Sequence, residues 1–205
     1  MQITLLNSNV MGVSRTTDAR TRPALLAAAR ELFYDRGVAA TAVDDIAARS
    51  GLTKPTLYRH YPSKVALLGA YLDERHEQLD ADLRGWIEAA PPKDRPRAVI
   101  DWLCDWIARP GFNGCAFVRA TTELPDDEAV REKARERKRA LLNAITAACE
   151  AAEPADAVGL AQQLALIVEG ATTMAYVTGD SRMGSTAARA LGQVALAAAG
   201  VPAGR

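Results

Sequence analysis

The sequence predicts an all-α protein composed of two helical domains. Apolar residues recur at the three- and four-residue spacing of helices, Ala and Leu dominate, and no run rich in Val, Ile or Thr alternates like a strand. Lys and Arg outnumber Asp and Glu before residue 72, whereas acidic residues are in excess after it, and the whole chain has no net charge. This asymmetry favours a basic N-terminal domain that meets a polyanion, although a solvated basic face would give the same excess.

The composition also excludes several classes of protein. The 205 residues are enough for a small and a medium domain, each with its own core. Three widely spaced cysteines, Cys104, Cys115 and Cys149, form neither a CxxC pair nor a disulfide framework, which favours a reducing cytoplasm. No segment has the features of a secretory signal or the roughly 18 uncharged apolar residues of a membrane span. We expect a cytoplasmic protein with no membrane partner, metal or cofactor, in which residues 1–19 are a disordered leader or translation begins at Met11.

Cap and turn residues divide the N-terminal third into short helices. Ser, Thr and Asp side chains cap helix starts, Pro is tolerated in a first turn, and Gly supplies the left-handed backbone that ends a helix. Four helices are expected here: about 22–36 with Pro23 in its first turn, a short one from a capping box at 41–44 to Ser50, one capped by Thr53, and one from Ser63 to Trp86.

Two of these helices have the spacing of a helix-turn-helix. Ile46 and Ala47 precede the turn residue Gly51, and Leu52 and Leu57 follow it. On spacing alone, an ordinary helix pair joined by glycine is an equally good interpretation. The composition of the third helix favours DNA binding, because it gathers donors and aromatic hydroxyls that a packed core would not use: Lys54, Thr56, Tyr58, Arg59, His60 and Tyr61.

The same residues carry a family resemblance. The run AARSGLTKPTLYRHYPSK over 47–64, preceded by the apolar pair at 32–33 and by Gly37, resembles the DNA-binding domain of TetR/AcrR family transcriptional regulators over about residues 21–71. Ser50 stands where that family more often has Ala, and Tyr61 stands where Phe is more frequent, which adds a hydroxyl near the DNA backbone. The resemblance implies an N-terminal three-helix helix-turn-helix DNA-binding domain over 20–72 and a C-terminal helical ligand-binding and dimerisation domain over 73–205.

The resemblance further implies a role for each residue of the motif. Lys54 and Thr56 would face base edges in the major groove, where Lys donates to guanine and Thr contacts a thymine methyl. Arg59 reaches either a base or solvent, and both alternatives stay open. Phosphate contacts are implied for the remaining polar positions, namely Tyr58, His60, Lys64 and the caps Thr41 and Thr53.

The C-terminal part is expected to hold five more helices, over about 97–108, 115–124, 126–152, 155–178 and 185–199. Gly114 to Phe117, with Glu123 after it, is similar to one TetR subgroup whose ligands include aromatic compounds. Bulky side chains around few polar groups are typical of small-ligand sites, which gives a candidate pocket wall: Trp86, Trp102, Trp106, Phe112, Phe117, Met174 and Tyr176. Taken singly, an aromatic residue at helical spacing is more often a core residue. Glu169 interrupts an apolar run, for which an exposed helix edge is the first interpretation and a ligand contact the second, so it joins the candidate ligand contacts.

The last two expected helices carry small residues that allow close helix packing: Ala161, Ala165, Gly170, Ala171, Ala175, Ala188, Gly192, Ala195 and Ala199. Family members pair these two helices of each subunit in a four-helix bundle. The resemblance therefore implies a homodimer that binds near-palindromic, double-stranded operator DNA.

These expectations combine into a ligand-responsive transcriptional regulator, a repressor that a small hydrophobic or aromatic effector releases from its operator. Two other classes stay open, namely a small helical enzyme and a helical interaction adaptor. The enzyme is disfavoured because no cysteine has a histidine near it in sequence, and His60 and His76 fall in or just after the DNA-binding module. We therefore expect a protein that is not an enzyme.

Overall fold

The chain folds entirely as helices in the part that the structure describes. The computed structural model describes residues 11–201, with side chains from Arg20 onward. Within that part there are nine α-helices, one short 3-10 helix and no strand, which confirms the all-α prediction. The chain divides into two compact units, one ending at Tyr71 and one beginning at Leu72. The division falls inside a continuous helix, α4 (Lys64–Ala89), one residue before the boundary expected from the sequence.

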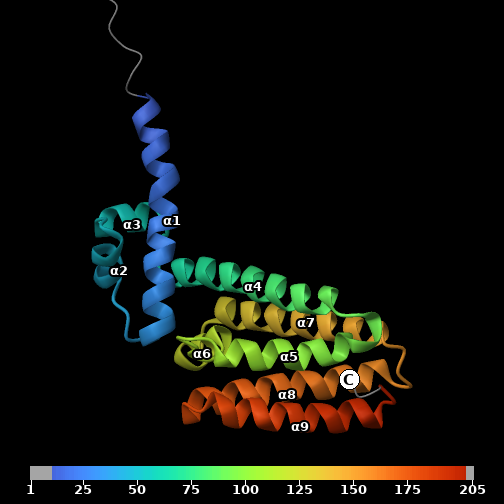
Figure 1. Cartoon of the computed structure of the whole chain (residues 1–205). Helices are drawn as coiled ribbons and strands as arrows, with labels where there is room; N and C mark the ends of the chain where they lie inside the picture. The colour runs from blue at the N-terminus through green and yellow to red at the C-terminus, as the bar shows by residue number, and fades with distance from the viewer. Residues whose placement is uncertain (1–10, 202–205) are drawn as a thin grey trace, which may run out of the picture. The chain divides into compact units, whose positions relative to one another are not determined.

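The first unit holds α1 (Met11–Arg36), α2 (Val43–Ser50) and α3 (Lys54–His60). Figure 1 shows α2 and α3 beside the long α1. The predicted disordered leader is wrong for residues 11–19, whose backbone is helical, while residues 1–10 lie outside the described part. The prediction took Pro23 to mark the first turn of the helix. Proline removes one backbone hydrogen bond but does not prevent the helix from beginning earlier in the chain.

The turn between α2 and α3 follows from two residues. Gly51 adopts the left-handed conformation, with φ of 69°, and its amide donates to the carbonyls that α2 leaves open at its end. Thr53 then accepts a hydrogen bond from the amide of Thr56 at 3.4 Å, which satisfies one free donor at the start of α3. Ile46 and Leu57 are fully buried on the two helices, so the turn holds them against the core of this unit.

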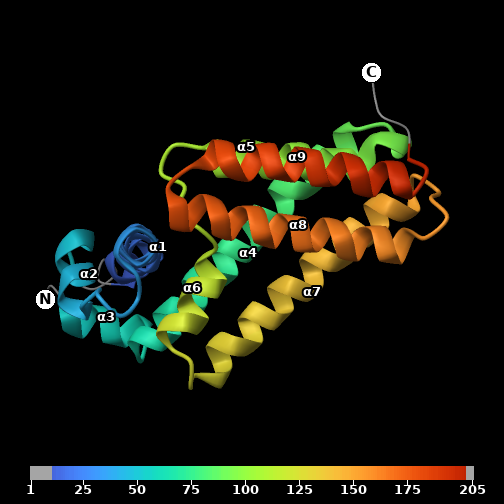
Figure 2. The same ribbon diagram turned by 90° about the horizontal axis from the view of Figure 1, so that it is seen from below.

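The second unit is a bundle in which α8 lies between α7 and α9, and α5 packs against both α8 and α9 (Figure 2). Its core is built from aliphatic and indole side chains, among them Trp102, Leu103, Ile107, Ile145 and Leu164. The elements are η1 (Pro92–Asp94), α5 (Arg95–Ala108), α6 (Ala116–Glu123), α7 (Glu128–Glu150), α8 (Ala157–Thr178) and α9 (Ser181–Ala198).

Most of these bounds lie close to the expected ones, but α9 begins at Ser181 rather than at Ser185. The cause is Asp180, whose carboxylate accepts hydrogen bonds from the amides of Arg182 at 2.9 Å and Met183 at 3.2 Å. An aspartate in this position stabilises a helix start through both hydrogen bonding and the helix dipole. The extra turn brings Gly184 against α8 and α5, where an added Cβ would lie 3.0 Å from the carbonyl oxygen of Ala171.

Candidate functional site

Helix α3 turns one face into its unit and the other to solvent. Leu57 of α3 and Tyr61, the residue that follows the helix, are buried. The outward set consists of the exposed residues Thr53, Lys54, Tyr58 and Arg59, with Thr56 and His60 half-buried at its edge. Tyr58 is 42% exposed, although aromatic side chains are usually covered when a packed core is available. The solvent side of α3 therefore holds the base-contact and phosphate-contact residues that the sequence predicted for this helix.

Two of these residues already have partners within the motif. The Lys54 ammonium lies 3.1 Å from the carboxylate of Asp44 on α2, and the hydroxyls of Thr53 and Thr56 lie 3.0 Å apart. Both pairs are solvent-exposed, so each stabilises the fold only weakly. The Asp44 carboxylate orients the long Lys54 side chain, which must exchange Asp44 for a base acceptor to read DNA.

Thr41 does not contribute to this surface, contrary to the prediction. Its buried hydroxyl donates to the carbonyl oxygens of Gly37 at 2.7 Å and Leu32 at 3.2 Å, and its amide donates to Val38. The residue before α2 is Ala42, whose amide donates to the Asp45 carboxylate at 3.4 Å. Alanine has no side-chain acceptor, so only this half of a capping box is present. The sequence pattern placed the cap one residue too early, and Thr41 closes the α1–α2 loop instead.

The hydroxyl of Tyr61 is also not on a DNA-facing surface. Tyr61 ends α3, its side chain is buried, and the guanidinium of Arg22 on α1 lies 5.0 Å from the ring centroid. Its hydroxyl oxygen is enclosed by the unit. Tyr61 is therefore a core residue that fixes the end of α3, as the more frequent Phe would do.

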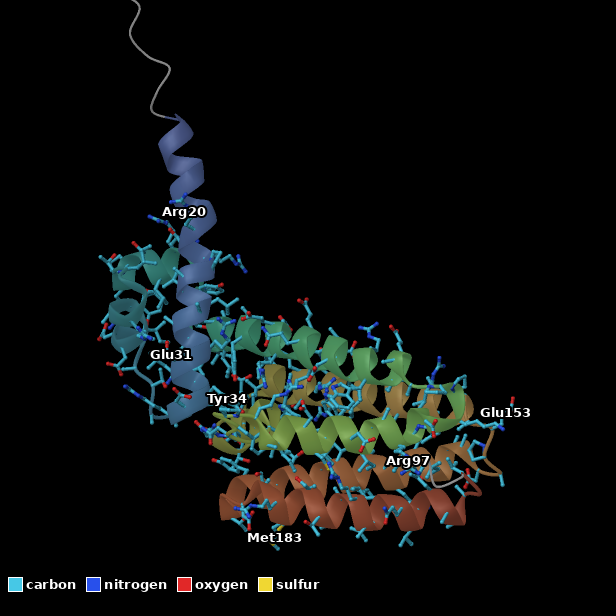
Figure 3. The ribbon with its side chains drawn as sticks, in the orientation of Figure 1. Arg20, Glu31, Tyr34, Arg97, Glu153 and Met183 are labelled. Carbon is cyan, nitrogen blue, oxygen red and sulfur yellow. The ribbon has the colours of Figure 1, made fainter. Side chains whose placement is uncertain are left out.

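A charged pair that the sequence reading missed braces the motif. Glu31 projects from α1 (Figure 3), and its carboxylate accepts from the Arg49 guanidinium of α2 at 2.6 and 3.0 Å. This hydrogen-bonded charge pair lowers the pKa of Glu31 and raises that of Arg49. The two residues are 18 positions apart, so no helical spacing rule relates them. The bidentate geometry orients α2 on α1 and thereby the helix that follows.

Lys64 is the first residue of α4 and is half-buried. The hydroxyl of Ser63 accepts from the amide of Ala66 at 3.0 Å, so Ser63 caps the helix. The other free amides of that first turn carry partial positive charge, which suits the predicted phosphate contact of Lys64.

In the second unit, three predicted pocket residues form one aromatic cluster. The rings of Trp102 and Trp106 stack with centroids 5.4 Å apart, and Phe112 lies edge-on to Trp106 at 5.3 Å. The indole N–H of Trp102 donates to the carboxylate of Asp82 on α4 at 3.0 Å. Both tryptophans are buried. The packing makes them core residues of the α4–α5 contact, which was the alternative interpretation of each aromatic residue.

The other predicted pocket residues lie in different places. Phe117 is buried on α6 with its ring 6.5 Å from that of His76 on α4, whereas Trp86 is exposed on α4. Tyr176 on α8 is exposed, with the Arg119 guanidinium 5.4 Å from its ring centroid. The structure therefore does not join the eight candidates into a single wall.

Glu169 is half-buried and paired. Its carboxylate lies 2.5 Å from the ammonium of Lys138 on α7. The same ammonium is 3.9 Å from the Cys115 sulfur, which precedes α6. The carboxylate that interrupts the apolar run of α8 thus faces α7 and the start of α6 rather than an open helix edge.

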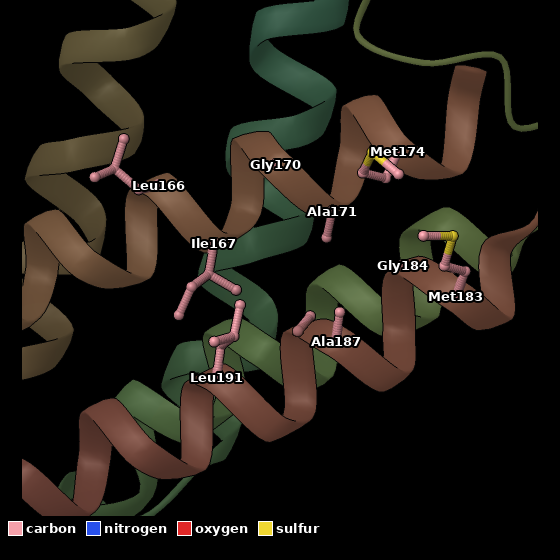
Figure 4. Close-up of a pocket in the computed structure, with 10 residues that line it drawn as sticks. Leu166, Ile167, Gly170, Ala171, Met174, Met183, Gly184, Ala187 and Leu191 are labelled. Carbon is pink, nitrogen blue, oxygen red and sulfur yellow. The ribbon is translucent and has the colours of Figure 1, made fainter. Parts of the chain in front are cut away.

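A groove of about 350 Å³ lies between α8 and α9 (Figure 4). Leu166 and Met174 from α8 and Met183 and Leu191 from α9 line it, so its walls are almost wholly apolar. Met174 is the one predicted pocket residue in this groove. Leu166 and Leu191 are more than half exposed, which is unusual for leucine on a surface that nothing covers.

The described residues hold no group of three or more His, Cys, Asp or Glu side chains arranged to bind a metal ion. No helix among them is long and apolar enough to span a bilayer. Cys104 and Cys149 are buried thiols, and burial raises the pKa of both, that of Cys149 to about 12.

Residues 25–71 match the family described as bacterial regulatory proteins, tetR family. The N-terminal part of the chain is therefore similar to the DNA-binding domain of the TetR family. The activator FasR of Mycolicibacterium smegmatis is 38% identical over 87 residues, which are 42% of this chain and 40% of FasR. The regulator EthR of Mycobacterium tuberculosis is 40% identical over 72 residues, 35% of this chain and 33% of EthR. These alignments span less than half of either relative.

The similarity of fold extends further along the chain. The TetR-family regulator SCO4454 of Streptomyces coelicolor has a structure that matches with a TM-score of 0.82 and 28% identity, covering 88% of this chain and 96% of that one. The proteins matched by sequence and by structure are transcriptional regulators, so the comparisons confirm the prediction that this chain is not an enzyme. The helix-turn-helix part of the fold prediction is confirmed in the same way.

Proposed function

We propose that this chain is a DNA-binding transcriptional regulator of the TetR family that acts as a homodimer and responds to a small molecule. The observation that carries the proposal is the solvent side of α3, where Lys54, Tyr58 and Arg59 are exposed on a helix that Leu57 fastens to the core. Side chains of this kind on a short, rigidly held helix suit a major groove and its flanking phosphates. A bacterial DNA-binding regulator must reach the chromosome, which lies in the cytoplasm, so the expected cytoplasmic location follows from this proposal.

The second copy of the chain fits the outer face of α8 and α9. Most of the exposed large apolar side chains of the described residues lie on these two helices: Val158, Leu166, Met174, Tyr176, Val177, Met183, Leu191 and Val194. An apolar patch of this extent on a water-soluble surface marks an interaction site. Two-fold pairing of the face would give a four-helix contact and two recognition helices, which read a near-palindromic site together.

Between repression and activation, we propose repression, in which the chain acts by occupying its operator. It requires only DNA binding and release, both of which a dimer with an effector site supplies. FasR is named as an activator, so the family resemblance alone does not fix the direction. If effector and DNA bind one dimer antagonistically, each must weaken the affinity of the other by the same factor.

Sequencing the genomic fragments that the purified protein retains tests the proposal. We expect the wild-type chain to enrich fragments that share an inverted repeat, with half-sites about 34–36 Å apart along the DNA. The double variant Lys54→Ala/Tyr58→Ala, which alters only exposed side chains of α3, should lose this enrichment. Lys93→Ala, an exposed lysine of η1, serves as the matched control and should retain it. Equal enrichment by all three proteins would refute DNA recognition through α3.

A further inference from the structure

Arg137 on α7 is an arginine in the interior of the second unit. It is only 4% exposed. Its nearest carboxylate oxygen, Oδ1 of Asp80, is 3.9 Å from Nη1, beyond hydrogen-bond distance, and this nitrogen has no hydrogen-bond partner among the described side chains. Burying a guanidinium without close pairing destabilises a protein, because the lost hydration is not replaced. Such a group is a candidate for a role other than stability.

The surrounding charges do not supply a close partner. The Asp80 carboxylate binds the Arg84 guanidinium one turn further along α4, and Glu169 pairs with Lys138. Burial lowers the pKa of Arg137, opposed by the negative charges of Asp80 and Glu169 and by Cys115, and reinforced by the positive charge of Arg75. Asp80 and Glu169 thus each have another cation beside them, and Nη1 of Arg137 is left without a hydrogen-bond partner among the described residues.

A second unused donor lies on α8. The hydroxyl of Thr172 is enclosed, with the residue 3% exposed, and has no hydrogen-bond partner among the described residues. Thr172 is three positions after Glu169, so the two share the face of α8 that meets Lys138 of α7. Four positions later, Tyr176 lies against Gly114, where an added Cβ would be 2.8 Å from the ring. The contacts of Lys138 with Glu169 and Cys115, and of Tyr176 with Gly114, therefore bring α7, α8 and the start of α6 together in the part of the unit that holds Arg137 and Thr172.

We propose that Arg137 and Thr172 bind the carboxylate of a small aromatic acid inside the unit that begins at Leu72. The planar guanidinium matches a carboxylate in a two-point hydrogen bond, and the threonine hydroxyl donates a third. The buried ring of Phe117, with His76 beside it, provides apolar contact for the body of the acid. A monoanion fits better than a phosphate, because the carboxylates of Asp80 and Glu169 would repel a dianion. The inference rests on the proposed function, since it names the class of effector.

The test measures ligand binding to the full chain without DNA. Benzoate and phenylacetate are the probes, and benzamide and phenylacetamide are uncharged controls of nearly the same shape. We expect the carboxylates to raise the thermal midpoint by about 5 °C near 100-fold saturation, and the amides to leave it unchanged. Calorimetric titration gives the affinities. Carboxylates that bind no better than their amides, or do not bind at all, overturn the proposal.

Three variants assign the binding to residues. Arg137→Met should weaken carboxylate binding about 10- to 100-fold, while the ligand-free midpoint stays the same or rises. Thr172→Val, which removes only the hydroxyl, should weaken it by a few-fold. Arg139→Met, on the exposed side of the same helix, is the matched control and should bind as the wild type does. An Arg137→Met chain that folds and binds the carboxylates as tightly as the wild type would overturn the assignment.

The outcome is separable from that of the regulator proposal. DNA retention by ligand-free protein depends on α3, so wild-type enrichment of genomic fragments combined with no carboxylate binding would reject the effector class alone. If Arg137→Met does not fold, Thr172→Val decides, because replacing an unpaired buried hydroxyl by a methyl leaves the core filled. Unchanged carboxylate affinity in Thr172→Val would then contradict the proposal.

Discussion

Lys54 and Lys64 differ in the kind of DNA contact that their positions allow. Lys54 is in the first turn of α3 and shares its charge with Asp44 at 3.1 Å, whereas Lys64 begins α4 beside the amides of that helix. A lysine that donates to one base contributes to sequence preference, and a lysine on a phosphate contributes to affinity for any sequence. The two residues therefore separate recognition from positioning.

Lys54→Ala is predicted to relax preference at particular operator positions by roughly 1–3 kcal/mol each, because a base contact is lost. Lys64→Ala should instead weaken binding to all DNA and reduce the slope of log affinity against log salt by about one. Affinities for a set of single-base operator variants, measured at several salt concentrations, distinguish the two effects. Uniform weakening by Lys54→Ala across that set would remove it from the base contacts.

The buried thiol of Cys149 should make the stability of the chain depend on pH. Its pKa in the folded chain is raised to about 12 by burial, above the ordinary value of 9.0. The unfolded chain therefore loses this proton first as the pH rises, so the stability that the neutral thiol contributes is complete below about pH 9 and declines toward pH 12. The free energy of unfolding of the wild type should fall more steeply above pH 9 than that of Cys149→Ala, by up to about 1.4 kcal/mol per pH unit. Parallel curves would show that the thiol titrates normally.

The role of a single residue was predictable from the sequence where it depends only on neighbouring residues of the chain. Thr53 and Gly51 cap and end helices through their own backbone neighbourhood, and the structure places both as the sequence indicated. The predicted DNA-facing positions of the Thr41 and Tyr61 hydroxyls were wrong, because the sequence shows that a hydroxyl is present but not the direction in which it points. Arg137 stands among residues of mixed charge in the sequence, which gives no sign of its burial, because that burial depends on how α7 packs against α4, α6 and α8.

At the scale of the element, the loop that leads into α6 is constrained by its packing. Gly114 has φ of 77° and lies against the ring of Tyr176, and Arg119 both donates to the Asn113 carbonyl at 3.2 Å and covers that ring. A Cβ at position 114 meets two obstacles, the left-handed backbone and the aromatic side chain.

Gly114→Ala is therefore expected to destabilise the chain by about 2–4 kcal/mol, from backbone strain and displacement of Tyr176 together. Gly85→Ala is the matched control, because an added Cβ at this exposed position inside α4 meets nothing within 4 Å. That change should stabilise the helix by about 0.5–1 kcal/mol. Denaturant unfolding of both variants checks the prediction, and equal stabilities would mean that the loop before α6 is not constrained.

Helices were easier to predict than the contacts between them. Periodicity and turn residues located every described α-helix, and they missed the early start of α1 and the Asp180 cap of α9. The candidate ligand wall was less successful, because an aromatic residue at helical spacing has the same sequence signature in a core as in a pocket. Trp102 packs on Trp106, and Trp106 packs on Phe112. Whether such residues form a core or line a pocket depends on the tertiary structure.

At the scale of the whole molecule, the proposed function depends on two copies of the chain. One α3 helix of seven residues reaches too few bases for specificity, whereas two helices joined through a dimer read twice as many. The apolar face of α8 and α9 is the surface that we assign to this association.

The double variant Leu191→Glu/Val194→Glu, which places charges on exposed positions of α9, is predicted to be monomeric and to bind operator DNA far more weakly than the wild type. Val118→Glu, an exposed apolar position on α6, is the matched control and should remain dimeric. Sedimentation equilibrium at micromolar concentration measures the mass of each. A dimeric double variant would place the interface on another surface.

The most direct test of the account is the ratio of two affinities. With an operator recovered from the retained fragments and a scrambled duplex of the same length and composition, both dissociation constants are measured at one physiological salt concentration. A regulator that reads bases through α3 should favour its operator by about 1,000-fold or more, and Lys54→Ala should reduce that ratio. A ratio near one, unchanged by Lys54→Ala, would contradict sequence-specific recognition by this chain.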